Sequence, residues 1–147
     1  MKRRISVRIF ILLVGTVLFY ACSAGSNDSL KFYIGSSVSQ EHSIYLAELE
    51  LVTLEFSLVD SFSGAPGASY LSPSEDWKYL YAIDRSISNE EQHASLTAFY
   101  REGNSLEVLN SESSKGKGIC HLHNSKDGKY LFAANYNSGH ASVLPLS

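Results

Sequence analysis

The stretch Gly118–Asn135 reads GICHLHNSKDGKYLFAAN and decides the fold. An alternating run of apolar and polar residues leads into a turn at Asn124–Gly128, and a second apolar run returns from it. Asp127-Gly128 between the two runs predicts a β-hairpin, because glycine accepts the positive φ that a tight reverse turn requires. The same pattern occurs earlier, where Gly67–Asp84 reads GASYLSPSEDWKYLYAID.

The two copies align without a gap 51 residues apart and carry the same or a closely related residue at many positions. The matched pairs include Gly67 and Gly118, Leu71 and Leu122, Ser74 and Ser125, Asp76 and Asp127, Lys78 and Lys129, Tyr79 and Tyr130, Leu80 and Leu131, Ala82 and Ala133, Asp84 and Asn135. A fixed period of about 50 residues built from short strands indicates a radial β array. We therefore expect an all-β fold, a β-propeller of four-stranded blades.

The rest of the chain supplies further short strands. They are expected at residues 31–35, 43–49, 54–59, 95–100, 106–109 and 141–146, with a polar loop at 85–93 and a turn at Gly103-Asn104. This gives one complete blade, from Gly67 to about Ser111, and parts of its two neighbours. Because propellers typically need four to eight blades, we expect only the first two to three blades of a longer ring here. A truncated gene or a split reading frame would produce such a chain, which we expect to be inactive alone.

The N-terminus, residues 1–21, is expected to be a lipoprotein-type signal peptide. Its positive end is formed by Lys2, Arg3, Arg4 and Arg8. The apolar run Ile9–Ala21 is 13 residues long, which suits a signal peptide and is shorter than the roughly 20 residues that span a bilayer.

Cys22 follows a small residue and precedes a polar stretch, in a pattern that resembles the bacterial lipobox. Phe19 and Tyr20 depart from that pattern. We expect a lipid on Cys22, a polar tether over residues 22–30, and export to a bacterial membrane surface. Ser23, rather than Asp, after Cys22 favours the outer membrane and the periplasm in a Gram-negative cell. A plain secretory signal cut near Ala24 and a retained anchor are the alternatives.

Composition excludes several classes of function. The net charge is −3 with 18% charged residues, so no nucleic-acid partner is expected. With Cys22 used for the anchor, Cys120 is the one remaining thiol, which excludes a disulfide scaffold. We also expect no cofactor.

Longer motifs connect residues 31–147 to a known family. They are FYIGS at 32–36, YLSPSEDWKYLYAID at 70–84, GKGICHL at 116–122 and DGKYLFAANYNSGHASVLPL at 127–146. These stretches resemble the seven-bladed β-propeller lactonases, similar to the bacterial 6-phosphogluconolactonases and the fungal carboxy-muconate cyclases. The resemblance covers about the first third of such a protein. Departures are Ile119 where proline is common, His123 and Asn124 for small or apolar residues, and His140 for a short polar one.

The resemblance implies hydrolysis of a sugar-acid lactone at the channel mouth. Most residues credited with catalysis in the family would lie beyond Ser147. His121 is the tentative catalytic residue within this chain, because a strand near the channel would place it to donate to a substrate carbonyl or carboxylate. A hydrogen bond between blades is its structural alternative. Period-two alternation puts Ile119, His121 and His123 on one face of the strand and Cys120 with Leu122 on the other.

Lys117, Asn135 and Tyr136 are weak candidates for substrate binding. Lys117, with Lys115, precedes the strand of His121, where cations attract an acidic substrate; a solvated loop is the alternative. Asn135 matches Asp84 in the repeat, which favours a structural role in a turn.

Three further residues are expected to have structural roles. His123 with His121 has the H-x-H spacing of metal ligands, but no third ligand is evident, so no metal is expected. Cys120 is expected to be buried rather than a nucleophile. Trp77, in the place of Gly128, is expected to be a partly exposed turn aromatic.

Two classes of function therefore remain, and a degraded gene product without a function is the third alternative. The first is a lactonase acting on a small-molecule lactone or sugar acid. The second is a non-catalytic, surface-anchored propeller that binds a ligand or a partner protein, because propellers carry many unrelated functions.

Overall fold

The computed structural model describes residues 28–38, 41–87 and 93–147. This part of the chain contains ten strands and no helix. The strands are β1 (Ser29–Gly35), β2 (Ile44–Glu50), β3 (Phe56–Phe62), β4 (Leu71–Pro73), β5 (Tyr79–Ile87), β6 (Ala94–Glu102), β7 (Ser105–Ser113), β8 (Ile119–Asn124), β9 (Tyr130–Asn135) and β10 (His140–Pro145). The described residues include no helix long and apolar enough to cross a membrane.

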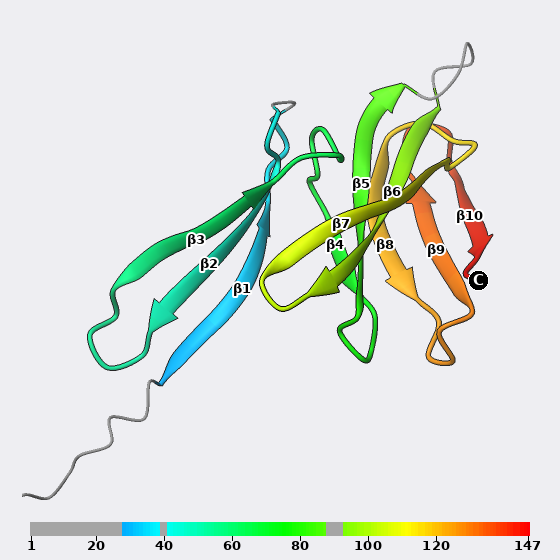
Figure 1. The fold of residues 1–147 in the computed structure, drawn as a ribbon. Coiled ribbons are helices and arrows are strands. Elements are labelled where there is room, and N and C mark those ends of the chain that lie inside the picture. Colours follow the sequence, from blue (N-terminus) through cyan, green and yellow to red (C-terminus); the bar gives the residue numbers. More distant parts are fainter. Residues whose placement is uncertain (1–27, 39–40, 88–92) are drawn as a thin grey trace, which may run out of the picture.

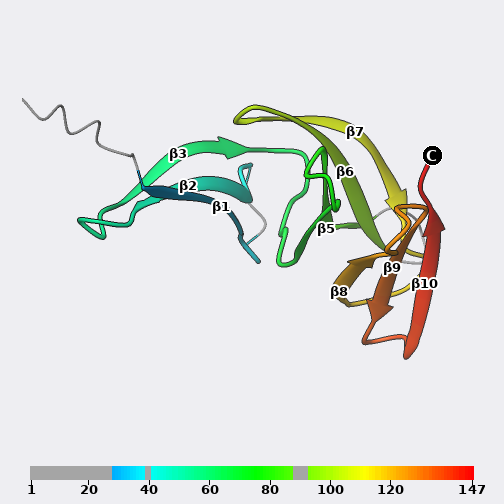
Figure 2. The ribbon, with the colours of Figure 1, turned by 90° about the horizontal axis from the view of Figure 1, so that it is seen from below.

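The strands form three antiparallel sheets that follow one another around an arc (Figures 1 and 2). Their orders are β1-β2-β3, β4-β5-β6-β7 and β10-β9-β8. The middle sheet is the complete four-stranded blade that the repeat predicts. The fold is therefore all-β and a partial β-propeller, as expected. The predicted signal peptide, Cys22 and most of the tether lie outside the described residues.

Both copies of the repeated hairpin form as predicted. The β8–β9 turn contains Gly128 at φ 69°, and Trp77 takes the matching place in the β4–β5 turn at φ 59°. Trp77 is an exposed aromatic, in agreement with its expected place in the turn. Glycine suits this left-handed conformation because it has no Cβ, whereas tryptophan adopts it at an energetic cost.

Several strand predictions need correction at their boundaries; the strand predicted at 106–109, for example, is the longer β7 (Ser105–Ser113). β3 begins at Phe56 instead of residue 54, because Leu54 lies in a turn at φ 58° and its amide donates to the Glu50 carbonyl at 2.8 Å. β5 continues to Ile87, into the predicted polar loop. Leu54 keeps the alternating pattern of β3 although it lies in the turn. β5 continues through polar residues across a register shift between Asp84 and Ile87, so the pattern alone does not mark the end of either strand.

β8 also departs from the predicted alternation. Its register against β9 shifts between Ile119 and His121, which is the mark of a β-bulge. As a result, Ile119 and Leu122 are both buried in one cluster, while Cys120 and His121 are both exposed. The expectation that Cys120 is buried is wrong, and so is the expectation that Ile119 and His121 share a face.

The core lies between the sheets. Alternate residues of β5 point to opposite faces of the middle sheet, so Tyr81 and Ile83 join one apolar cluster while Leu80 and Ala82 join the other. The first cluster includes Leu122 of the third sheet, and the second includes Ile44 of the first. Burying one such leucine or isoleucine contributes about 1.5–3 kcal/mol. Packing between sheets therefore places the strand ends that carry the candidate site.

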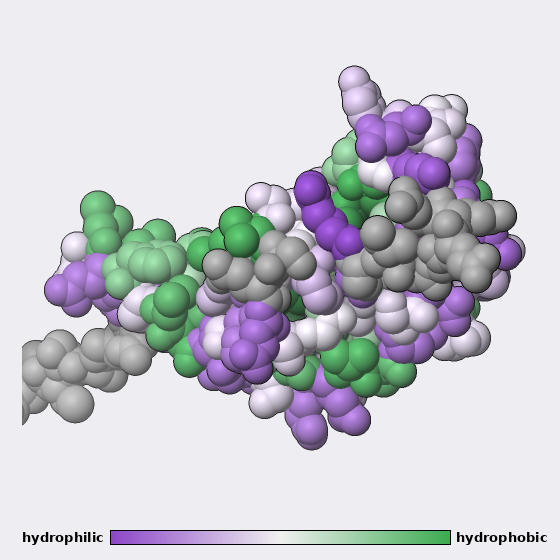
Figure 3. All heavy atoms as spheres, turned by 90° about the horizontal axis from the view of Figure 1, so that it is seen from above, coloured by the Kyte–Doolittle hydropathy of each residue, from purple (hydrophilic) through white to green (hydrophobic). Residues whose placement is uncertain are grey.

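Apolar side chains gather over the first sheet, at the left of Figure 3. They include Leu30, Phe56 and Leu58, all of which are exposed. Leu30 and Phe56 both lie opposite Leu49 in neighbouring strands, so they share one face of the sheet. Residues of the middle sheet, in contrast, join apolar clusters on both of its faces.

Candidate functional site

The first strands of the second and third sheets, β4 and β8, lie side by side, and His121 of β8 contacts Tyr70 just before β4. Its ring meets the ring of Tyr70 with centroids 4.5 Å apart and planes tilted by 54°. Tyr70 stands 51 residues before His121, so the two rings occupy equivalent places in successive blades. The aromatic contact fixes one side of the imidazole and leaves His121 exposed to solvent.

Asn124 joins the same two strands nearer to their ends. Its Nδ2 donates to the Ser72 hydroxyl at 3.1 Å and to the Pro73 carbonyl at 2.6 Å. This contact between blades places the β4–β5 and β8–β9 turns next to each other. Asn124 therefore makes a hydrogen bond between blades, which is the structural role considered above as the alternative for His121.

Lys117 and Tyr136 lie at the opposite end of the third sheet. Three hydrogen bonds connect their loops: the Lys117 amide donates to the Ser138 hydroxyl at 3.0 Å, the Tyr136 amide to the Gly118 carbonyl at 2.9 Å, and the Asn137 amide to the Lys117 carbonyl at 3.1 Å. Both side chains are exposed, Tyr136 to 80%. The structure thus brings a cation and a phenol to one surface, with the exposed Lys115 in the same loop.

Asn135 lies beneath this surface and only 2% of it is exposed. Its Nδ2 donates to the Ser142 hydroxyl at 2.7 Å, and that hydroxyl donates to the Ser114 carbonyl. Its Oδ1 is buried and has no hydrogen-bond partner among the described residues. The side chain therefore supports the loop of Lys117 from within.

The middle sheet repeats this buried polar arrangement. Asp84, which matches Asn135, accepts a hydrogen bond from the Thr97 hydroxyl at 3.2 Å. Thr97 lies opposite Ala82, as Ser142 lies opposite Ala133, and Ala82 and Ala133 are themselves matched. Such a repeated link indicates that this position holds each blade together.

His123 and Cys120 do not form a second centre. The described residues contain no group of three or more His, Cys, Asp or Glu side chains placed to hold a metal ion. The exposed Cys120 directs its thiol to the Ala134 carbonyl at 3.7 Å. Cys22 lies outside the described residues.

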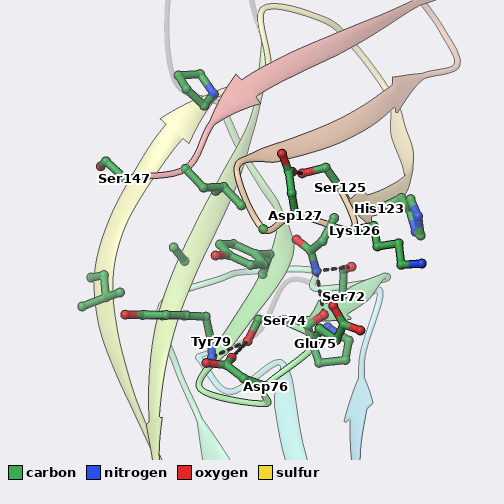
Figure 4. A pocket seen from close by; sticks show the side chains of 18 of the residues that line it. Ser72, Ser74, Glu75, Asp76, Tyr79, His123, Ser125, Lys126, Asp127 and Ser147 are labelled. Atoms are coloured by element: carbon green, nitrogen blue, oxygen red, sulfur yellow. Dashed lines mark hydrogen bonds between the residues drawn. The ribbon is translucent and has the colours of Figure 1, made fainter.

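A cavity lies at the turn end of the sheets (Figure 4), and neither Lys117 nor Tyr136 lines it. This turn cleft has a volume of about 1040 Å³ and is lined by residues 72–76, 79, 81, 98, 109–110, 123–128 and 145–147. His123 and Asn124 reach it, whereas His121 does not. The sequence analysis missed the cleft, although its two Ser-x-Asp turns are visible in the repeat.

Those turns hold two carboxylates in equivalent surroundings. Ser74 donates to Asp76 at 2.7 Å and Ser125 donates to Asp127 at 2.6 Å. These side-chain hydrogen bonds, followed by those from the backbone amides of Lys78 and Lys129, hold the pKa of each carboxyl below its ordinary value. Because hydrogen bonding favours the charged form, both carboxylates stay ionised at neutral pH.

Comparison with known proteins shows which family this chain resembles. The sequence model described as "Lactonase, 7-bladed beta-propeller" matches residues 31–147. An uncharacterised protein of Staphylococcus epidermidis is 31% identical over 119 residues, which cover 78% of this chain and 33% of that protein. A 6-phosphogluconolactonase of Formosa agariphila is 26% identical over 95 residues, 63% of this chain and 26% of the relative.

Solved structures similar to this chain agree with the family match. A putative 6-phosphogluconolactonase of Bacteroides fragilis aligns with a TM-score of 0.70 and 26% identity, over 84% of this chain and 34% of that one. A putative 6-phosphogluconolactonase of Bacteroides uniformis aligns with a TM-score of 0.66 and 30% identity, over 82% of this chain and 34% of that one. The chain thus spans about a third of the length of these proteins. The family match over residues 31–147, together with the repeated four-stranded blade, shows that this chain belongs to the lactonase family of seven-bladed β-propellers.

Proposed function

We propose that this chain is the N-terminal part of a propeller that hydrolyses a sugar-acid lactone. The observation that carries the proposal is the family match over residues 31–147, supported by the likeness to a 6-phosphogluconolactonase. In the reaction, water adds to the lactone carbonyl carbon, the ring carbon–oxygen bond breaks, and a hydroxy acid forms that releases one proton at neutral pH.

The proposal gives distinct roles to the exposed residues. His121 is held on one side by Tyr70 and open to solvent on the other, which suits a donor to the carbonyl oxygen as negative charge develops there. Lys117 attracts an acidic substrate, and Tyr136 offers a hydroxyl at the same surface. The remaining catalytic groups belong to other blades.

We further propose that the protein is exported and held at a bacterial membrane by a lipid on Cys22. The support is the positive N-terminus, the apolar run of 13 residues and the Cys that follows it. Mass spectrometry of the N-terminal peptide tests this, because a lipidated Cys22 carries acyl chains and an unmodified one does not.

A pH-stat assay tests the activity directly. The protein as the cell makes it is mixed with gluconolactone or 6-phosphogluconolactone, and the proton released on ring opening is titrated. His121→Ala should lower turnover by about tenfold or more, with an unchanged melting temperature. His123→Ala is the matched control, because it removes an exposed histidine two residues further along β8. Equal turnover in wild type and His121→Ala would remove His121 from the site.

The second candidate function is ligand binding without catalysis, and the turn cleft favours it. The cleft combines Tyr79 and Tyr81 with the two ionised carboxylates and the Asn124 amide, a mixture of apolar and polar groups typical of small-molecule sites. A protein that binds a sugar acid without opening its lactone would support this alternative.

A further inference from the structure

The turn between β2 and β3 presents large apolar side chains to water. Leu51, Val52 and Leu54 are all exposed, Val52 to 78%. Tight turns favour glycine, asparagine and aspartate, and a leucine at the positive φ of Leu54 is strained. Turn formation therefore does not explain why three apolar residues occupy this tip, called the hairpin tip below (residues 51–54).

The hairpin tip lies beside the point where the chain arrives from its N-terminal segment. The Leu51 amide donates to the Asp28 carbonyl at 2.7 Å. Cys22 precedes Asp28 by six residues, and six fully extended residues span at most about 20 Å. A lipid on Cys22 would therefore hold the hairpin tip close to the membrane surface.

The one tryptophan of the chain lies at the same end of the sheets. Trp77 is exposed in the β4–β5 turn, and its carbonyl accepts from the Arg101 guanidinium at 3.1 Å. Arg101 lies in β6, just before the β6–β7 turn. In that turn the Asn104 side chain accepts from Lys31 Nζ at 3.3 Å, near the start of β1. These contacts place the start of β1 and the Trp77 turn at one end (Figure 1).

Lys117 and Tyr136 lie at the other end. Asn124 binds Pro73 just before the turns of β8–β9 and β4–β5, so those two turns share the end of Trp77. The loops of Lys117 and Tyr136 lie at the opposite ends of β8 and β9 from their common turn. A surface beside the hairpin tip is therefore remote from the candidate site.

The charges at the end of the sheets that carries the hairpin tip determine which kind of bilayer surface this end would bind. Acidic side chains such as Glu50 and Glu55 stand near the hairpin tip. Near Trp77, Lys78 pairs with Asp76 at 3.4 Å and Arg101 adds a positive charge. This mixture gives no strong attraction to anionic lipid. Apolar insertion with an aromatic residue at headgroup level suits a neutral, zwitterionic surface and depends little on salt.

We propose that the hairpin tip and Trp77 contact a phospholipid bilayer, so that Lys117 and Tyr136 face away from the membrane. The proposal rests on the lipid anchor proposed above and adds the orientation of the domain. Attachment at one point alone would let the domain turn freely. A second apolar contact beside the anchor removes that freedom and keeps the candidate site open to soluble substrate.

The test places a tryptophan at either end. In a Trp77→Phe background, Val52→Trp and Tyr136→Trp each carry one tryptophan at positions of matched exposure, 78% and 80%. The lipidated proteins are reconstituted in phosphatidylcholine vesicles with brominated acyl chains, which quench tryptophan fluorescence at close range. We expect quenching at position 52 to exceed that at position 136 by about threefold or more, because only the former approaches the acyl chains.

A second variant keeps the natural reporter. Val52→Asp with Leu54→Asp should lower quenching of Trp77 in the same vesicles, since a charged tip resists insertion. Equal quenching at positions 52 and 136, with a lipid found on Cys22, would overturn the orientation and leave the anchor in place. An unmodified Cys22 would overturn both. Lactone hydrolysis, measured separately in solution, depends on neither result.

Discussion

A substitution at Gly116 tests whether the Asn135 side chain supports the loop of Lys117. A Cβ added at Gly116 would lie 2.7 Å from Asn135 Cβ and closer still to its Cγ and Oδ1, inside the 3.0 Å that real Cβ atoms keep. Asn135 is almost fully buried and bound to Ser142, so it has no room to turn away. We expect Gly116→Ala to destabilise the protein by about 1–3 kcal/mol, the usual cost of overpacking.

A double-mutant cycle isolates the cause. All three nearest atoms belong to the Asn135 side chain, so Gly116→Ala in an Asn135→Gly background should cost little. The free energy of unfolding is measured by urea titration of the protein as the cell makes it, followed by circular dichroism. Coupling of about 0.5–3 kcal/mol is expected for residues in contact. An equal cost of Gly116→Ala in both backgrounds would refute the argument that Asn135 supports this loop.

Three further predictions follow from the packing and the charges. Phe99, fully buried between the first and second sheets, should lose about 3–5 kcal/mol of stability as Phe99→Ala, and a loss below 1 kcal/mol in urea titration would contradict the described core. The folded pKa values of Asp76 and Asp127 lie below their ordinary value of 3.8, so both carboxylates contribute stability above pH 3.8 that is lost as pH falls through the lowered values. The double Asp→Asn variant should therefore lose stability less steeply below pH 3.8. An unchanged slope would show that the two carboxylates do not contribute to the loss of stability in acid. Because the first sheet exposes an apolar face, the 147-residue chain alone should self-associate in sedimentation and show no cooperative monomeric melt, whereas a monodisperse monomer with a sharp transition would show that this face needs no cover.

The repeated hairpin was predictable because its causes are local. Alternating apolar residues and a glycine at positive φ define the strands and the turn of β8–β9 without reference to the rest of the chain. The 51-residue offset then places a second hairpin at β4–β5, and the structure confirms it. Exposure of Trp77 followed from the same alignment.

The β-bulge in β8 was not predictable in this way. Strict alternation assumes that each residue opposes one partner, but the register shift between Ile119 and His121 leaves Cys120 without one. Burial of Ile119 and Leu122 against the middle sheet decides the arrangement. That contact joins residues from different blades, and no local pattern reveals it.

The candidate site was partly predictable. The sequence analysis named Lys117 and Tyr136 as candidates for substrate binding, and the structure joins their loops through hydrogen bonds. The match of Asn135 to Asp84 favoured a structural role, which agrees with its burial. The turn cleft escaped prediction because segments far apart in the chain, from residue 72 to residue 147, build it together.

Amide NMR during titration with gluconate, a sugar acid of the proposed product class, tests the central claim most directly. The account predicts chemical-shift changes at His121, Lys117 and Tyr136 that saturate with ligand, with little change in the turn cleft. Changes confined to Tyr79, Asn124 and the cleft around them would contradict it, and would assign ligand binding to the opposite end of the sheets.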